Sequence, residues 1–160
     1  MTDKYTLDKS SEIVLKDGTK LYRIVALKDF EVNKKAVIKK GNLGGYVQSM
    51  RNLSQNGGAW IGARSVVRGS AFVCGDAYVG GKSEIWGEAY ITGEALVRDS
   101  KVCDNAIICD ACQVYECILT GNQHVGSSSY MSNCHFGKSQ NACDNSVYNE
   151  VFAKNDAMVK

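Results

Sequence analysis

Residues 61–96 consist of six consecutive repeats of six residues, and this period limits the folds open to the chain. The first place of each repeat is Val or Ile, the fifth is Ala or Ser, and the third is Gly in five of the six. An amphipathic helix repeats about every 3.6 residues, which this pattern does not do. A six-residue period instead predicts one short strand and one corner per unit, so that three units close a triangular coil and coils stack about 4.8 Å apart. The aliphatic and small places then face inward, and glycine supplies the backbone freedom that a corner needs.

The repeat continues beyond residue 96 with steps of five or six residues. Asp and Asn, which tolerate left-handed backbone better than most residues, replace Gly near the later corners. We therefore predict an all-β chain with a parallel β-helix of about six coils over residues 46–160. The expected inward residues are Leu43, Val47, Leu53, Val97, Val102, Ile108, Val114, Leu119, Val125, Met131, Phe136, Ala142, Phe152 and Val159. The expected corner residues are Asp99, Asp104, Asn105 and Asp110.

Residues 1–45 lack the repeat and predict a small N-terminal β cap. Residues 12–15 and 20–27 flank Asp17-Gly18, a pair typical of a tight hairpin turn. Residues 28–40 read as a charged connector. A parallel solenoid exposes unpaired backbone at its ends, so a cap prevents further strands from adding there. Residues 145–160 either cover the other end or leave it open for a partner.

Several segments resemble known proteins. The hexads are similar to those of the hexapeptide-repeat β-helices, and this resemblance implies a left-handed coil. Residues 21–30 (LYRIVALKDF), 41–47 (GNLGGYV) and 52–61 (NLSQNGGAWI) resemble the YdcK-like family of bacterial and prophage proteins, with a match that covers residues 4–100 well. That resemblance implies a phage or prophage origin. Some relatives are labelled transferases from their fold, but the family offers no catalytic residues to carry over.

The composition argues against several classes of protein. Residues 1–58 hold 11 Lys and Arg against 6 Asp and Glu, while residues 59–160 hold 8 against 11, for a net charge of only +2 overall. No apolar run approaches the roughly 20 residues of a membrane span, and the N-terminus lacks the apolar core of a signal peptide. We expect a cytoplasmic protein, in the host cytosol if phage-encoded, whose seven cysteines are free thiols.

The sixth place of each hexad points outward, and it often holds an aromatic or aliphatic residue. Because three hexads make one coil, these places stack in rows on three faces. The rows are Trp60, Tyr78, Leu96 and Tyr130; Phe72, Tyr90, Ile107 and His124; and Val66, Glu84 and Lys101. Aromatic rows stabilise stacked strands, but so much apolar surface in solvent favours burial against another chain. We predict a protein interface on the first two rows.

Acyl transfer is the alternative. Hexapeptide-type acyltransferases use acyl-CoA and a histidine base, and only His124 and His135 are available here. Each precedes an inward residue and lies on no inserted loop, so ordinary surface histidines are the favoured interpretation. Fold alone is a weak reason to assign this activity.

A metal site is not expected. Cys109 and Cys112 have the spacing of zinc ligands, and Cys103 and Cys117 lie nearby. These four residues fall at different offsets in the hexads, so they should not converge, and only Cys117 and Cys134 are about one coil apart. We expect structural thiols, no metal and no cofactor.

The leading hypothesis is a non-enzymatic binding protein. It would self-associate as a dimer or trimer and dock on another protein, such as a host defence component, to inhibit or redirect it. The third hypothesis is a structural phage component that forms fibres. Nucleic acid is disfavoured as a partner because no known docking motif accompanies the basic residues Lys34, Lys35, Lys39, Lys40 and Arg51.

Overall fold

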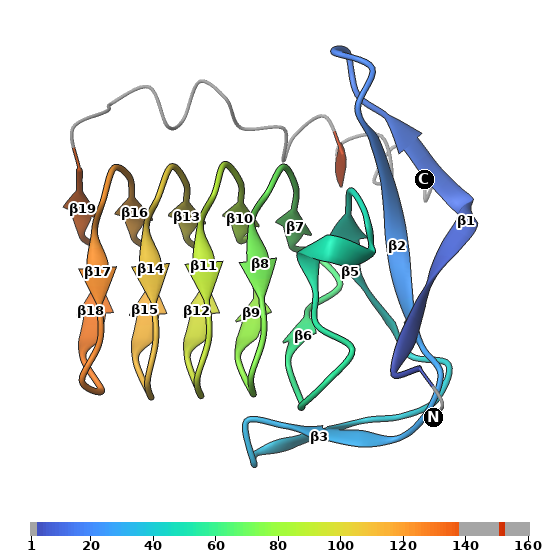
Figure 1. Cartoon of the computed structure of the whole chain (residues 1–160), viewed down its shortest axis with the longest axis horizontal. Coiled ribbons are helices and arrows are strands. Elements are labelled where there is room, and N and C mark those ends of the chain that lie inside the picture. Colours follow the sequence, from blue (N-terminus) through green and yellow to red (C-terminus); the bar gives the residue numbers. More distant parts are fainter. Residues whose placement is uncertain (1–2, 138–150, 153–160) are drawn as a thin grey trace.

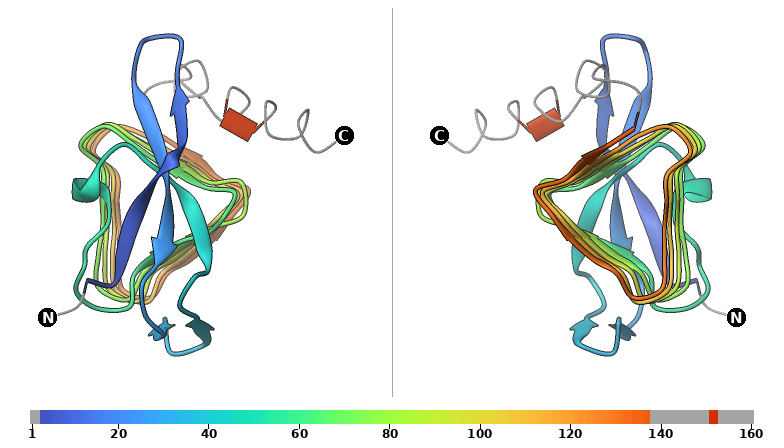
Figure 2. Two further views of the ribbon diagram at one scale, coloured as in Figure 1. Left: turned by 90° about the vertical axis from the view of Figure 1, so that its right-hand side faces the viewer. Right: turned by 90° about the vertical axis from the view of Figure 1, so that its left-hand side faces the viewer.

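The hexads form a left-handed parallel β-helix of roughly five coils in the computed structural model, which describes residues 3–137 and 151–152 (Figure 1). Viewed along its axis, the β-helix is a triangular prism (Figure 2). Seen from the N-terminal end, the chain turns anticlockwise as it recedes, which is the left-handed sense that the family resemblance implied.

Each coil places one short strand on each of three faces. Face one carries β7 (Val66–Val67), β10 (Glu84–Ile85), β13 (Lys101–Val102), β16 (Ile118–Leu119) and β19 (His135–Phe136). Face two carries β8 (Phe72–Val73), β11 (Tyr90–Ile91), β14 (Ile107–Ile108) and β17 (His124–Val125). Face three carries β6 (Trp60–Ile61), β9 (Tyr78–Gly80), β12 (Leu96–Arg98), β15 (Gln113–Tyr115) and β18 (Tyr130–Ser132).

The register keeps each inward side chain above its counterpart in the previous coil. Val67 pairs with Ile85, which lies three full hexads further along the chain. Ile85 pairs with Val102, so this next coil is shorter than three hexads by a single residue. The lost residue falls at the corner between faces three and one, where the step to the next inward residue is five instead of six. Because the deletion recurs at the same corner, the three faces stay aligned.

The core is the dry interior of the prism. The aliphatic places from Ile61 to Leu119 are fully buried, as are the small residues of the fifth place. Val67, Val73 and Val79, from three successive strands, lie in one cluster with the rest of this interior. The structure therefore confirms the inward direction predicted for the first and fifth places.

The corners need left-handed backbone, which the sequence supplies first with glycine and then with acidic residues. Gly93 has a φ of 72°, and a Cβ there would lie 2.7 Å from backbone atoms of Asp110 in the next coil. Asp99, Asp104 and Asp110 have positive φ, as predicted. Asn105 is not among the positive-φ residues; instead, Glu116 occupies a left-handed corner that its residue type did not indicate.

The N-terminal cap is a three-stranded antiparallel arrangement that continues into face one. β1 (Tyr5–Val14) pairs with β2 (Lys20–Ala26) around the predicted Asp-Gly turn, and β2 pairs with β5 (Leu43–Val47). β5 then pairs in parallel with β7, so the same strand ends the cap and begins the coils. The short 3-10 helix η1 (Met50–Asn52) follows β5 in the first coil.

The segment expected to be a charged connector is instead a second hairpin. β3 (Phe30–Val32) pairs with β4 (Ala36–Ile38), and the hairpin lies against the N-terminal part of face three (Figure 1). The ring of Phe30 packs edge-on against Trp60 with 5.4 Å between centroids. The lysines of this segment led to the prediction of a connector. The apolar residues at its ends form the hairpin instead.

Two residues at the start of the chain fix the cap to the first coil. The Lys4 ammonium is buried, and it donates to the carbonyls of Ala59 at 2.7 Å and Gly57 at 3.2 Å. The Tyr5 hydroxyl donates to the Leu53 carbonyl at 2.6 Å. Burial lowers the pKa of Lys4 to about 8 and raises that of Tyr5.

The prediction that residue 152 belongs to a last coil is wrong. Residues 151–152 are helical and lie back at the N-terminal end, where the ring of Phe152 packs edge-on against Tyr46 at 5.8 Å. An aromatic residue near six-residue spacing resembles a coil residue in sequence, but here its partners belong to the cap. Ala142 and Val159 lie outside the described residues.

We expect Ile108→Ala to lower the free energy of unfolding by about 2–5 kcal/mol, because it leaves a cavity in the prism. The matched control is Ile107→Ala, which removes the same atoms from the neighbouring outward side chain and should cost less than about 1 kcal/mol. Chemical denaturation followed by circular dichroism measures both. Equal costs would contradict the inward and outward assignment of these two residues.

The pH dependence of Lys4 gives a second test. Between about pH 8 and the usual lysine pKa of 10.5, the unfolded chain holds a proton that the folded chain has released. The contribution of Lys4 to stability therefore rises with pH through this window. The difference in unfolding free energy between wild type and Lys4→Met should be larger at pH 9.5 than at pH 7.5. A difference that is constant or falls with pH would contradict the burial of this ammonium group.

Candidate protein-binding surface

The outward side chains stack in the three rows that the repeat predicted. Phe72 pairs with Tyr90, Tyr90 with Ile107, and Ile107 with His124 on face two. On face three the row runs from Trp60 through Tyr78 and Leu96, and Gln113 then separates Leu96 from Tyr130. Val66, Glu84 and Lys101 align on face one. Stacking therefore follows from the sequence, but exposure does not.

Face three is partly covered by the chain itself. Trp60 is only 2% exposed because the β3–β4 hairpin and Phe30 lie over it. Tyr78 is half-buried and receives the guanidinium of Arg98, 5.7 Å from its ring centroid. Tyr130, at the far end, is 68% exposed. The row that looked continuous in sequence offers little free aromatic surface at its N-terminal end.

Face one is covered at its N-terminal end as well. Val66 and Glu84 are fully buried although both point outward, and Phe152 belongs to the same cluster as Val66. The Arg68 guanidinium lies 3.4 Å from the Glu84 carboxylate and 5.4 Å from the ring centroid of Trp86. These polar and aromatic groups already have partners within the chain.

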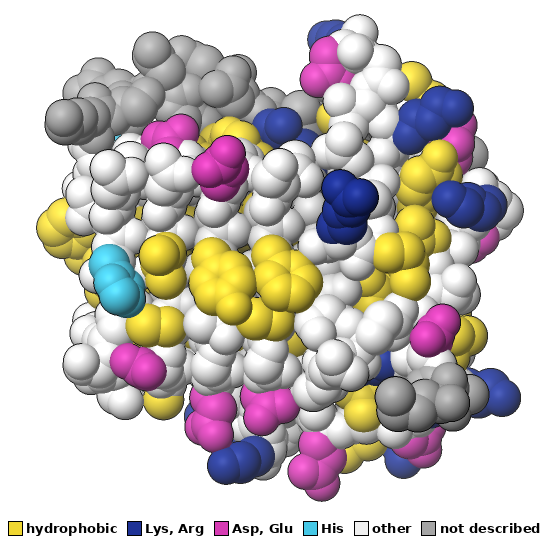
Figure 3. Space-filling model, viewed as in Figure 1, with side chains coloured by type: hydrophobic (Ala, Val, Ile, Leu, Met, Phe, Trp, Pro, Cys, Tyr) yellow, Lys and Arg dark blue, Asp and Glu magenta, His cyan; other side chains and the backbone are white. Residues whose placement is uncertain are grey.

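Face two is the face on which the apolar row remains in solvent. We name Phe72, Tyr90, Ile107 and His124 the apolar stripe. The rings of Phe72 and Tyr90 stack with centroids 5.9 Å apart and planes at 29°. Tyr90 is 38% exposed, and Phe72 and Ile107 are half-buried. Figure 3 shows the stripe as a continuous apolar band across this face, with a histidine at its C-terminal end.

Thiols hold the polar groups of the stripe in place. Cys74 donates to the Tyr90 hydroxyl and contacts the Thr92 hydroxyl, both at 3.2 Å. The contact with Cys74 raises the pKa of Tyr90. Cys109 Sγ lies 3.4 Å from His124 Nε2. These contacts limit the rotamers of Tyr90 and His124, so the surface is largely pre-formed for binding.

Carboxylates border the stripe on both sides (Figure 3). Glu88 and Asp104 lie at the corners between faces one and two, and Asp76, Glu94 and Asp110 lie at the corners between faces two and three. Residues 69–137 contain eight Asp and Glu but only three Lys and Arg, and those three (Lys82, Arg98 and Lys101) lie on or beside faces one and three. The stripe is therefore an apolar band between two rows of carboxylates, which we name the acidic rows, and within them Glu94 pairs with Lys34 of the β3–β4 hairpin.

The two histidines do not form one site. His124 lies on β17 of face two and His135 on β19 of face one. His124 contacts Cys109, and the pKa of that thiol is raised by burial and by Asp110 beside it. A raised pKa lowers the thiolate fraction of Cys109 at neutral pH. His124, Cys109 and Asp110 line one hollow at the C-terminal end of the coils, whereas His135 does not belong to that lining.

The cysteines around residue 109 point in different directions. Cys103 is buried beside Trp86 on face one, Cys112 faces the interior and Cys109 lies at a corner of face two. In the part of the chain that the structure describes, no three His, Cys, Asp or Glu side chains come close enough to hold a metal ion. Cys117 and Cys134, about one coil apart, sit at the same corner.

The basic residues of the N-terminal part are divided among separate contacts. Lys34 pairs with Glu94 at 3.0 Å and Lys39 with Asp29 at 3.3 Å. Lys35 and Lys40 lie near them on the cap, whereas Arg51 belongs to η1 in the first coil.

A scan against models of protein families finds no match, and a search of curated proteins finds none either. Among residues 3–137 and 151–152, no helix is long and apolar enough to cross a membrane.

At the C-terminal end of the described coils, the register confirms the inward places predicted for Val125, Met131 and Phe136. The sequence did not indicate that all three are partly or largely exposed. Their residue types match earlier inward residues, so only the end of the regular repeat after Gly137 could have indicated a change at this point.

We expect Cys109 to react slowly with iodoacetamide at pH 7, because its raised pKa reduces the thiolate fraction below that of free cysteine. The rate should approach that of free cysteine as the pH rises above 9. Peptide mapping by mass spectrometry, with Cys109→Ser to assign the signal, measures this rate. Alkylation faster than that of glutathione at pH 7 would show an activated thiolate and contradict the raised pKa of Cys109.

Proposed function

We propose that this chain is a non-enzymatic binding protein that docks on another protein through the apolar stripe of face two. The observation that carries the proposal is that the apolar row is left in solvent on this face, whereas the rows of faces one and three are partly covered by other parts of the chain. Clustered aromatic surface of this kind is typical of the centre of a protein interface.

The two acidic rows indicate the chemistry of the partner. A surface that fits the stripe has an apolar ridge with Lys and Arg on both sides, because opposite charges at the rim speed association and fix the register. The stripe spans four coils, or about 15 Å. A stable interface buries about 800 Å² on each partner. The partner must therefore also cover the acidic rows, which makes binding sensitive to salt.

We also propose where the protein acts and which kind of partner it binds. If the chain is of phage or prophage origin, its partner is a protein of the host cytosol, and docking of a rigid prism over a basic surface would inhibit or redirect that protein. A host defence component is the partner of this kind that we propose. Support for this step comes from the resemblance of residues 4–100 to the YdcK-like family and from the charge of the face.

A pull-down with the tagged chain from lysate of the host cell tests the proposal. Tyr90→Asp places a charge in the middle of the stripe, and we expect it to weaken capture of the partner at least about tenfold, as loss of a central interface residue does. The matched control is Val37→Asp, which places the same charge at an exposed apolar residue of the cap hairpin. It should capture the partner as wild type does. No captured protein with wild type, or equal capture by Tyr90→Asp, contradicts docking through the stripe.

Charge reversal gives an independent readout of the same interface. Glu88→Lys combined with Asp104→Lys should weaken binding and reduce its salt dependence, because one acidic row becomes basic. Lys101→Glu reverses a charge on face one and should leave binding unchanged. Circular dichroism of each variant confirms that the β-helix is intact before binding is compared.

A further inference from the structure

The two ends of the prism differ in whether other described strands pair with the edges of the outermost coil. At the N-terminal end, β2 and β5 pair antiparallel, and β1 adds outside β2 (Figure 1). At the C-terminal end, β17, β18 and β19 are the last strands of the three sheets. No strand among the described residues pairs with their outer edges. Three strand edges whose N–H and C=O groups pair with no described strand therefore lie around one triangle.

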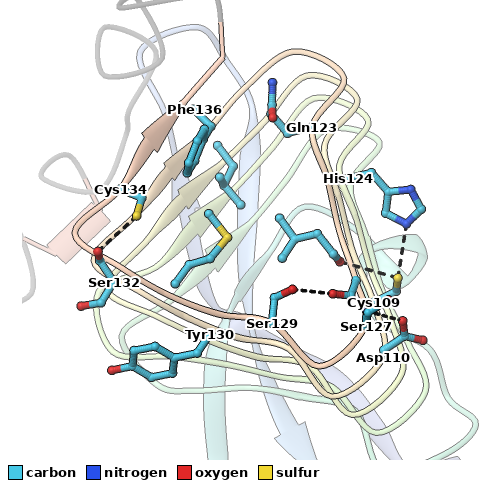
Figure 4. Close-up of a pocket in the computed structure, with 14 residues that line it drawn as sticks. Cys109, Asp110, Gln123, His124, Ser127, Ser129, Tyr130, Ser132, Cys134 and Phe136 are labelled. Carbon is cyan, nitrogen blue, oxygen red and sulfur yellow. Dashed lines mark hydrogen bonds between the residues drawn. The ribbon is translucent and has the colours of Figure 1, made fainter.

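Within the described residues, no further coil covers the interior of the prism at this end. Phe136 is 46% exposed, whereas Leu119, directly before it in the same stack, is fully buried. Val125 and Met131, the other two inward residues of the last coil, are half-buried. Together with Cys134 and Tyr130 they line a hollow of about 1170 Å³ (Figure 4). Earlier coils bury these places completely, so the last coil has the apolar interior of a core, and no further coil among the described residues covers it.

The rim of the hollow is ordered by short polar contacts. The Ser127 amide donates to the Asp110 carboxylate at 2.7 Å, and the Ser129 hydroxyl donates to the Gly126 carbonyl at 2.6 Å. Residues 117–137 contain no Asp, Glu, Lys or Arg. The end therefore has an ordered polar rim that includes Asp110, around apolar inward residues, and its last coil carries no Asp, Glu, Lys or Arg, so that two such ends approach with little repulsion.

We infer that the C-terminal end of the β-helix binds the C-terminal end of a second copy, to form a tail-to-tail dimer. A two-fold axis perpendicular to the prism reverses the strand direction, so the edges of the two copies meet antiparallel. The pairing of β2 with β5 shows that a coil edge of this chain accepts an antiparallel partner. The C-terminal end of a second copy presents three strand edges in the same arrangement. It can therefore pair with all three edges at once and cover Val125, Met131 and Phe136.

The cap limits the assembly to two copies. A head-to-tail contact would require an open N-terminal end, but β1 and β2 lie across it (Figure 2). An isologous contact between identical ends closes the assembly, whereas repeated head-to-tail contacts would make a fibre. The dimer leaves the apolar stripe on the sides of both prisms, so it goes beyond the docking function and does not depend on it.

Light scattering of the full chain tests the inference. One chain has a mass of 17.4 kDa, so the dimer should show about twice this mass. We expect wild type to shift toward dimer as its concentration rises from about 10 to 200 μM. Phe136→Asp places a charge in the hollow and should give the mass of one chain at every concentration. Tyr90→Asp, which disrupts the stripe, should dimerise as wild type does.

Hydrogen exchange supplies a second measurement that does not rely on a variant. Amides of β17, β18 and β19 should exchange more slowly in concentrated wild type than after dilution, while those of β14 should not change. A mass of one chain at every concentration, a trimer or fibres, or a dimer that survives Phe136→Asp overturns the inference. So does a dimer that is lost with Tyr90→Asp, because that result assigns self-association to the stripe.

Discussion

The structure depends on the register between successive coils, in which each short strand is held by backbone hydrogen bonds to the strands above and below it. A strand of two or three residues has no stability alone. Stacking gives it hydrogen-bonding partners on both edges. It also places its inward side chain in a dry interior that three strands enclose in each coil. Because the faces stay aligned even where a coil falls short of three full hexads, side chains one coil apart always meet. The outward side chains on each face of the β-helix are therefore aligned as well.

The alignment explains how a chain with little net charge acquires distinct faces. Single outward residues, repeated once per coil, become continuous rows, so that Phe72, Tyr90 and Ile107 form one band although they are far apart in sequence. Corner positions behave in the same way and gather carboxylates on both sides of that band. The same regularity leaves strand edges exposed at the ends of a solenoid, because nothing in the repeat prevents further strands from adding there. This chain closes one end with an antiparallel cap, and at the other end of the described coils it leaves apolar residues in solvent.

Much of the fold could be predicted because period six is a local property. The inward residues from Ile61 to Leu119, the stacked rows and three of the acidic corners follow from spacing and residue type. The β3–β4 hairpin could not be predicted in this way, because its stability comes from Phe30 against Trp60, a contact between segments far apart in the sequence. Phe152 was misplaced for a similar reason, since its partner Tyr46 lies in the cap.

The sequence by itself determined the repeat, the direction of each side chain in the coils and the residues that stack. Only the tertiary structure decided which rows remain in solvent. Trp60 and Tyr90 occupy equivalent places in their hexads, yet one is buried beneath a hairpin and the other is exposed. The spacing of residues along a chain fixes the orientation of side chains within a regular element, but exposure depends on what packs over that element, which is a property of contacts between distant segments.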